Sequence, residues 1–130
     1  MDYSLQRRAL LADVHAGRTG SFEVCDASPY LSRAAKYHGE VIDAVCPVCR
    51  KERLTQVNYV YGDHLGPTAG QAKTQAELAR MDAAQEEFTV YAVEVCRSCG
   101  WNHLDSSYVL GAEPVPGQQP RRGRRRAATE

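Results

Sequence analysis

Hydrophobic residues near the N-terminus recur at the spacing of a helix. Leu10, Leu11 and Val14 share one stripe within residues 3–16. Gly17 follows at the position where many helices end in a left-handed residue. We therefore predict a first helix over residues 3–16 and a turn after it.

Two later helices are indicated by their start signals. Pro29 suits the first helical position of residues 29–38, and either Asp26 or Ser28 can cap that helix. The string Thr74-Gln75-Ala76-Glu77 fits a capping box. This box predicts a helix from about residue 75 to residue 86.

Three other segments alternate in β-branched and aromatic residues, as strands do. They are residues 54–61, 88–95 and 106–110. The 26 residues from 62 to 87 are too many for a plain hairpin, so they form an insertion that carries the third helix. The pattern predicts an α+β fold with a three-stranded antiparallel sheet, two N-terminal helices and an inserted helix.

Two pairs of cysteines carry the strongest chemical signal: Cys46-Pro47-Val48-Cys49 and Cys96-Arg97-Ser98-Cys99. Two residues between the cysteines let one tight turn aim both sulfurs at a single ion. If residues 50–61 and 88–95 are antiparallel strands, both turns lie at one end of the sheet. We therefore predict a zinc-ribbon-like fold with one structural Zn²⁺ per chain, held by Cys46, Cys49, Cys96 and Cys99.

The residue after each cysteine pair tests this prediction, because that position often needs a left-handed backbone. Gly100 follows the second pair and fits, whereas Arg50 follows the first pair and fits less well. Two other interpretations of the four thiols stay open. They are a redox dithiol, for which one pair suffices, or buried thiols that bind nothing.

Three residues outside the pairs each allow more than one role. Cys25, the odd fifth cysteine, is either a small buried hydrophobe or a redox or ligand-exchange group. Trp101 either covers the metal as part of the core or is an exposed anchor for a partner. His103 is expected beside the site or at the surface, since as a ligand it would have to displace a cysteine.

The formal net charge of zero hides two unlike parts. Residues 121–130 contain five Arg and one acid and carry +4, whereas residues 1–120 hold 11 Lys or Arg against 15 Asp or Glu and carry −4. An acidic body is not expected to grip a duplex with its folded surface. The segment Arg121–Arg126 could contact the phosphates of a nucleic acid, or it is a solubilising tail.

The organisation of the chain follows from these patterns. We predict one domain over residues 1–112, with a helical part at 1–40 and a ribbon at 41–112. Residues 113–130 are expected to form a disordered Pro- and Gln-containing linker followed by the arginine-rich tail.

Several classes of protein are excluded on the same evidence. The 130-residue chain has no apolar run near the ~20 residues that cross a bilayer, and its N-terminus lacks the apolar core of a secretory signal. No nucleophile elbow, phosphate-binding loop or paired His–Glu metal motif is present. We therefore expect a cytoplasmic protein without catalytic activity or membrane contact.

Five strings together resemble a small actinobacterial family known as domain of unknown function 5318. They are Asp2–Leu11, Val24–Leu31, Arg33–Gly39, Cys46–Lys51 and Val95–His103. The resemblance covers about residues 2–111 and implies an actinobacterial cytoplasmic protein with no assigned activity. It also implies that Cys25-Asp26 and Trp101-Asn102-His103 belong to the family pattern, and that the arginine tail does not.

Two functions from different classes are consistent with these observations. The first is a non-catalytic zinc-binding module that acts as an accessory factor, with a protein or a ribonucleoprotein as its partner. Nucleic acid could be contacted through Arg121–Arg126. The second is a thiol-based redox or zinc-release sensor that uses Cys25 together with one of the cysteine turns.

Overall fold

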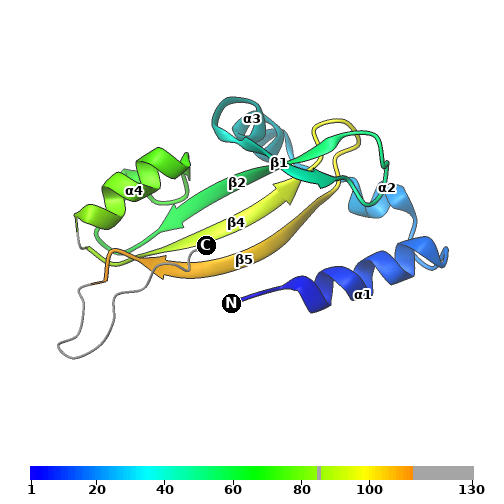
Figure 1. The fold of residues 1–130 in the computed structure, drawn as a ribbon, viewed down its shortest axis with the longest axis horizontal. Coiled ribbons are helices and arrows are strands. Elements are labelled where there is room, and N and C mark those ends of the chain that lie inside the picture. Colours follow the sequence, from blue (N-terminus) through cyan, green and yellow to red (C-terminus); the bar gives the residue numbers. More distant parts are fainter. Residues whose placement is uncertain (85, 113–130) are drawn as a thin grey trace.

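The structure is a computed structural model that describes residues 1–84 and 86–112. The predicted linker and arginine-rich tail, residues 113–130, lie outside the described part of the chain. Three helices come first in the chain, and the strands follow, with α4 inserted among them (Figure 1). In order they are α1 (Ser4–His15), α2 (Ser21–Val24), α3 (Pro29–His38), β1 (Glu40–Val45), β2 (Arg53–Tyr61), the 3-10 turn η1 (Gly66–Thr68), β3 (Ala72–Lys73), α4 (Gln75–Ala83), β4 (Phe88–Val95) and β5 (Asn102–Leu110).

The strands form one antiparallel sheet in the order β1-β2-β4-β5, and the short strand β3 pairs with β2. The sheet thus has five strands, so the predicted count of three is too low. The missed strands are β1 and β3. β1 is exposed at five of its six positions, and β3 has only two residues. Both strands are held by backbone hydrogen bonds to β2. Because such bonds do not depend on the side chains, these strands show no alternation of apolar residues in the sequence.

The predicted helices are present, with small changes at their ends. The N-terminal part contains three helices instead of two, because the four-residue α2 gave no periodic signal. α4 ends at Ala83 and not at residue 86. Its capping box is formed as expected: the Glu77 N–H donates to Thr74 Oγ1 at 3.2 Å, and the Thr74 N–H donates to Glu77 Oε1 at 2.8 Å.

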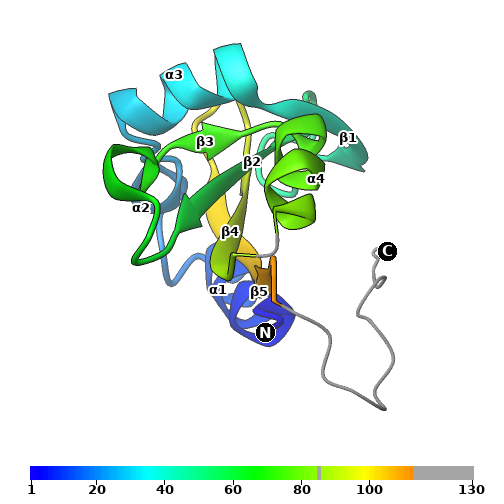
Figure 2. The same cartoon turned by 90° about the vertical axis from the view of Figure 1, so that its left-hand side faces the viewer.

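The helices cover both faces of the sheet. α3 packs Ala34 and Ala35 against Val57 and Val95. Val60 lies on the opposite face from Val57, because side chains alternate along a strand, and it packs with Leu78 of α4. α1 lies along β5, whereas α3 lies near β2 and β3, so the two helices are far apart on the sheet (Figures 1 and 2).

The first residues of the chain protect the outer edge of β5. Asp2 forms a bridge with Ser106, and the Tyr3 N–H donates to the Asp105 carbonyl oxygen at 3.1 Å. This pairing fixes where α1 begins, so that α1 reaches the end of the sheet that carries the cysteines. Within residues 1–84 and 86–112, no helix combines the length and the apolar character needed to cross a bilayer.

Candidate metal centre

Both cysteine turns lie at the same end of the sheet, as the antiparallel strands require. Thr55 near the start of β2 pairs with Val95 at the end of β4, so the turn before β2 and the turn after β4 are neighbours. Each turn is closed by a short hydrogen bond. The Cys46 N–H donates to the Glu52 carbonyl at 2.8 Å, and the Cys96 N–H donates to the Trp101 carbonyl at 2.8 Å.

The four sulfurs of the predicted ligand set meet at one point. The Sγ atoms of Cys46 and Cys99 are 3.7 Å apart, as are those of Cys49 and Cys96, and all four sulfurs lie within 4.8 Å of one another. A tetrahedral ion with metal–sulfur bonds of about 2.3 Å requires sulfur separations of about 3.8 Å. The four cysteines can therefore hold a metal ion, with one sulfur pair contributed by each turn.

Backbone N–H groups point at the sulfurs, and for three of them the distance is 3.4 Å. The Val48 N–H contacts Cys46 Sγ, and the Cys99 N–H contacts Cys96 Sγ, each at 3.4 Å. The Trp101 N–H reaches Cys99 Sγ at the same distance. Such N–H donors lower the energetic cost of gathering negative thiolates around one ion.

The protonation of the metal-free thiols differs between positions. Burial raises the pKa of both Cys46 and Cys99 to about 12. By contrast, the backbone N–H groups of Lys51 and Glu52 lower the pKa of Cys49 to about 7. Among these three thiols, Cys49 is therefore the first to ionise as the pH rises.

Both turns place a left-handed residue directly after the second cysteine. Gly100 has φ +92° and Arg50 has φ +58°. The Gly100 N–H donates to the Cys96 carbonyl and the Arg50 N–H donates to the Cys46 carbonyl, each at 3.0 Å. Arg50 thus adopts the same conformation as Gly100, although a side chain there carries a backbone cost.

Cys25 lies beside this cluster as a fifth sulfur. Its thiol donates to Cys99 Sγ at 3.5 Å, and the residue is partly exposed. Cys25 also packs against the core cluster of Leu11 and Trp101, as the hydrophobe interpretation expects, and its contact with Cys99 leaves the redox or ligand-exchange alternative open. Neither residue spacing nor periodicity could have indicated this contact, because the two cysteines are 74 positions apart.

The segment that carries Cys25 is fastened to the second turn. The Ala27 N–H donates to the Gly100 carbonyl at 3.0 Å, and Asn102 Nδ2 donates to Asp26 Oδ1 at 3.1 Å. These bonds join the segment Cys25-Asp26 to the segment Trp101-Asn102-His103, the two parts of the family pattern named in the resemblance. They fix the position of Cys25 relative to the ligands.

Trp101 belongs to the core and is not an exposed anchor. It is 0% exposed and packs with Leu11 and Leu54 next to the buried cysteines. Its Nε1 donates to Glu94 Oε2 at 2.7 Å, and Arg7 Nε of α1 donates to both Glu94 oxygens at 2.9 Å. This partly buried ion pair was missed in the sequence, where its one signal is that Glu94 is the single charged residue of its strand.

His103 is not part of the four-sulfur group. Its ring stacks on Trp101 with centroids 5.9 Å apart, and its Nδ1 lies 2.7 Å from the Leu104 carbonyl oxygen. The position beside the site matches the expectation.

Most of the chain is similar to mycobacterial proteins. "Uncharacterized protein Rv0049" of Mycobacterium tuberculosis (strain ATCC 25618 / H37Rv) and "Uncharacterized protein Mb0050" of Mycobacterium bovis are each 57% identical to it over 121 residues. The aligned part is 93% of this chain and 88% of each relative. No solved structure shows significant similarity to the chain.

The family match reaches further than the resemblance noted in the sequence. The family model covers residues 1–124, not only 2–111, and so includes the first arginines of the tail, Arg121, Arg122 and Arg124. The arginine tail therefore does not lie wholly outside the family pattern. On this match, and on the identity to the mycobacterial proteins, the chain belongs to the family of unknown function DUF5318.

Proposed function

We propose that the chain is a zinc-binding accessory module in which a single Zn²⁺ joins the ends of two hairpins. The observation that carries this proposal is the set of sulfur separations, which suits a tetrahedral ion with four thiolate ligands. The two turns, each at the end of a β-hairpin and each followed by a left-handed residue, give the arrangement its likeness to a zinc ribbon.

The role of the metal follows from the number of its ligands. Four protein sulfurs leave no coordination position open for water or substrate, so the ion stabilises the fold and takes no part in catalysis. Thiolate ligands must also stay reduced, which supports a cytoplasmic location. A closed metal site is thus best suited to a rigid binding module.

The surface supports a partner-binding role. Several large apolar side chains stand in solvent, among them Phe22 at 79% and Val41 at 63% exposure. Exposed large side chains on a small domain are frequent at interfaces. We therefore propose that the module docks onto a protein or a ribonucleoprotein.

The mass of the native protein, with and without a chelator, tests the metal proposal. We expect a mass increment of one zinc per chain, and we expect the near-UV circular dichroism of the buried Trp101 to be lost when the metal is removed. A metal-free native chain would contradict the proposal. So would iron accompanied by visible absorption, since four thiolates can also hold an iron–sulfur cluster.

Affinity capture tests the partner proposal, with the zinc-loaded chain as bait and Cys46→Ser as the unfolded control. We expect captured proteins or ribonucleoproteins that are absent from the control. If repeated capture experiments return no transcription components, no translation components and no nucleic acid, the accessory role is contradicted.

The position of Cys25 supports a second candidate function, a peroxide-sensitive zinc switch. Cys99 Sγ would attack a hydroperoxide, breaking the O–O bond to form a sulfenic acid, while the leaving oxygen takes a solvent proton and departs as water or an alcohol. The Cys25 thiol, 3.5 Å away, would then attack that sulfur, so that an S–S bond forms and water leaves with the Cys25 proton. The two thiols lose two electrons, the peroxide gains them, and the zinc loses one ligand.

Mild hydrogen peroxide separates this candidate from a purely structural site. The switch requires release of the zinc together with a Cys25–Cys99 disulfide, identified by peptide mapping. Cys25→Ser serves as the matched control, because it keeps all four ligands and should form no such disulfide. Retention of zinc by the unmodified chain under this treatment would exclude the switch.

A further inference from the structure

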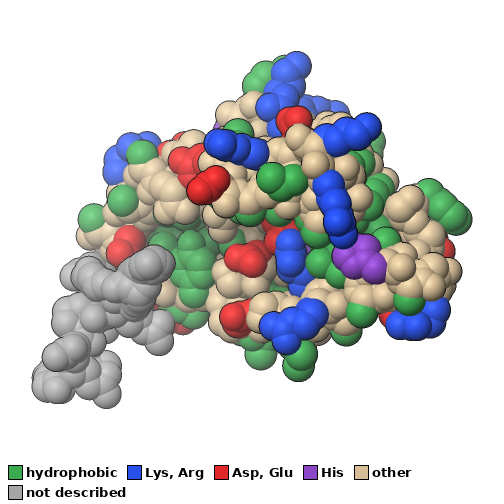
Figure 3. All heavy atoms as spheres, turned by 45° about the vertical axis from the view of Figure 1, so that its right-hand side comes forward, with side chains coloured by type: hydrophobic (Ala, Val, Ile, Leu, Met, Phe, Trp, Pro, Cys, Tyr) green, Lys and Arg blue, Asp and Glu red, His purple; other side chains and the backbone are tan. Residues whose placement is uncertain are grey.

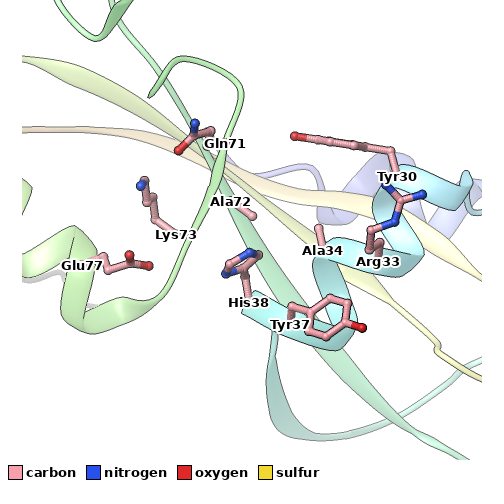
Figure 4. A pocket seen from close by; sticks show the side chains of 9 residues that line it. All are labelled: Tyr30, Arg33, Ala34, Tyr37, His38, Gln71, Ala72, Lys73 and Glu77. Carbon is pink, nitrogen blue, oxygen red and sulfur yellow. The ribbon is translucent and has the colours of Figure 1, made fainter. Parts of the chain in front are cut away.

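A groove of about 270 Å³ lies between α3 and the segment that carries β3 and α4. Its floor consists of Ala34 and Ala72, both buried, whose small side chains leave space for the hollow. Figure 4 shows that the lining residues come from two sides: Arg33 and Tyr37 belong to α3, and Lys73 belongs to β3. We call this feature the α3 groove.

The rim of the α3 groove is locally basic on an acidic body. Arg33 and Lys73 line it, and Lys36 stands 5.2 Å from the centre of the Tyr37 ring. Residues 1–112 as a whole contain 11 Lys or Arg against 14 Asp or Glu. Figure 3 shows Lys and Arg side chains on one face of the molecule, with acidic side chains among them. The groove therefore attracts anions.

One acid at the rim offsets part of this charge. Glu77 is the one acidic residue that lines the groove. Its carboxylate accepts the Thr74 N–H in the capping box, and this hydrogen bond is the main cause of its lowered pKa. With His38 neutral, the groove and Lys36 together carry a net charge of +2.

Two tyrosines on the same side of α3 supply aromatic surface. Tyr30 is 57% and Tyr37 is 66% exposed. They are seven residues apart, so they share one face of the helix and stand about 10 Å apart along its axis, with Arg33 between them. Tyr30 is held in place, because its ring stacks on Tyr59 and its hydroxyl donates to the Gly70 carbonyl at 2.9 Å.

The composition of the rim indicates what it binds. Apart from the alanine floor, the lining residues are aromatic, charged or amide side chains, with no Leu, Ile, Val or Met among them. A floor of two alanines offers little apolar surface to the anchor of a peptide, whereas flat rings can lie on tyrosines. Basic side chains interleaved with exposed aromatic rings are the usual combination for single-stranded nucleic acid.

We propose that the α3 groove binds single-stranded nucleic acid, with bases stacked on Tyr37 and Tyr30 and phosphates held by Arg33 and Lys73. Paired bases are not free to stack on these rings, so a duplex binds more weakly. This inference rests on the proposed partner-binding role and names its partner, while it leaves the metal site as a separate question.

Fluorescence anisotropy of short labelled oligouridine and oligothymidine tests the proposal on the full, zinc-loaded chain. Tyr37→Leu should weaken binding at least about fivefold, because one stacked base contributes about 1–3 kcal/mol. Tyr37→Phe keeps the ring and should bind like the unmodified chain. Oligouridine that binds more tightly than oligothymidine would identify RNA as the ligand, and the reverse order would identify DNA.

A charge variant tests the phosphate contact separately. Arg33→Ala should reduce the slope of log affinity against log salt by about 0.7, the value for one phosphate contact on a single strand. The control Arg8→Ala removes an exposed charge of the same sign from α1, far along the chain from the groove, and should leave that slope unchanged.

Three results would overturn the α3 groove as a nucleic-acid site. The first is the absence of binding, and the second is binding that neither Tyr37→Leu nor Arg33→Ala weakens, which would place it on the arginine tail. The third is displacement by polyglutamate as readily as by oligonucleotide, which would indicate a protein partner. Zinc content measured on the same samples distinguishes a failure of the nucleic-acid proposal from a failure of the metal proposal. A zinc-loaded chain that binds no oligonucleotide contradicts only the first.

Discussion

The turn from Cys46 to Arg50 connects the exposed edge strand β1 to β2. The turn from Cys96 to Gly100 connects β4 to β5, two strands that other elements cover. β1 is exposed at all but one of its positions and reaches β2 through an irregular register. β4, by contrast, lies between β2 and β5. The two turns have the same local hydrogen bonds, and both adjoin the core cluster of Leu11, Leu54 and Trp101. The second turn, however, makes more hydrogen bonds to the N-terminal segment than the first.

The contacts of the second turn come from three directions. The Gly100 carbonyl accepts the Ala27 N–H, Cys25 Sγ contacts Cys99 Sγ, and Trp101 is linked through Glu94 to Arg7 of α1. In the first turn, His15 Nε2 comes within 3.4 Å of the Pro47 carbonyl, and Arg50 is exposed. The difference suggests that the tertiary structure preforms the second half of the site and that the metal fixes the first half to it.

The largest expected effect tests whether both turns hold the same ion. Cys46→Ser and Cys99→Ser should each abolish tight zinc binding and cooperative unfolding, because the free energy of binding a structural zinc, on the order of 10 kcal/mol, is also folding free energy. Thermal unfolding and metal content measure this. Cys25→Ser is the control and should keep its zinc. If one turn's variant retained tight zinc, the turns would not share an ion.

Gly100→Ala should be the next largest effect, at about 2–3 kcal/mol of unfolding free energy. The new Cβ would sit at φ +92° and 3.0 Å from the Cys25 carbonyl oxygen. Gly17→Ala separates the two causes, because Gly17 is also left-handed but has no atom within 4 Å of an added Cβ. Urea unfolding of the zinc-loaded variants should therefore show a smaller loss for Gly17→Ala, and equal losses would mean that packing on Cys25 contributes nothing.

Arg7→Met should destabilise the chain by about 2 kcal/mol, because it leaves the buried Glu94 carboxylate with only the Trp101 N–H. This is less than for a fully buried pair, since the Arg7 side chain is 29% exposed. The exposed neighbour Arg8 offers the matched control, Arg8→Met, which should change stability by no more than about 0.5 kcal/mol. Similar losses in both variants would show that α1 does not support the second turn through Glu94.

The smallest expected effect lies in the first turn. Arg50→Gly relieves a left-handed side chain at φ +58° but adds chain entropy to the unfolded state, so we expect a gain of about 0.5 kcal/mol or less. A clear loss of stability, seen in the same urea titration, would mean that the Arg50 side chain makes contacts that matter and that the first turn is better supported than the comparison suggests.

Local signals in the sequence determined much of this protein. The start of α3 follows from Pro29 and the Ser28 cap, whose Oγ accepts the Leu31 N–H at 3.1 Å, and the start of α4 follows from its capping box. The spacing within each cysteine pair, together with antiparallel strands β2 and β4, was enough to predict that four sulfurs meet. The helix starts and the cysteine turns depend on residues within a few positions of each other. The meeting of the two turns depends only on the pairing of β2 with β4.

Only the tertiary structure decided the remainder. The edge strand β1 is held by pairing with β2 and not by its own pattern. The contact of Cys25 with Cys99 and the pairing of Arg7 with Glu94 each join residues more than 70 positions apart. The α3 groove likewise exists because a helix and a two-residue strand pack side by side over two alanines. Such contacts depend on how the elements pack in three dimensions, and periodicity along a chain carries no record of that packing.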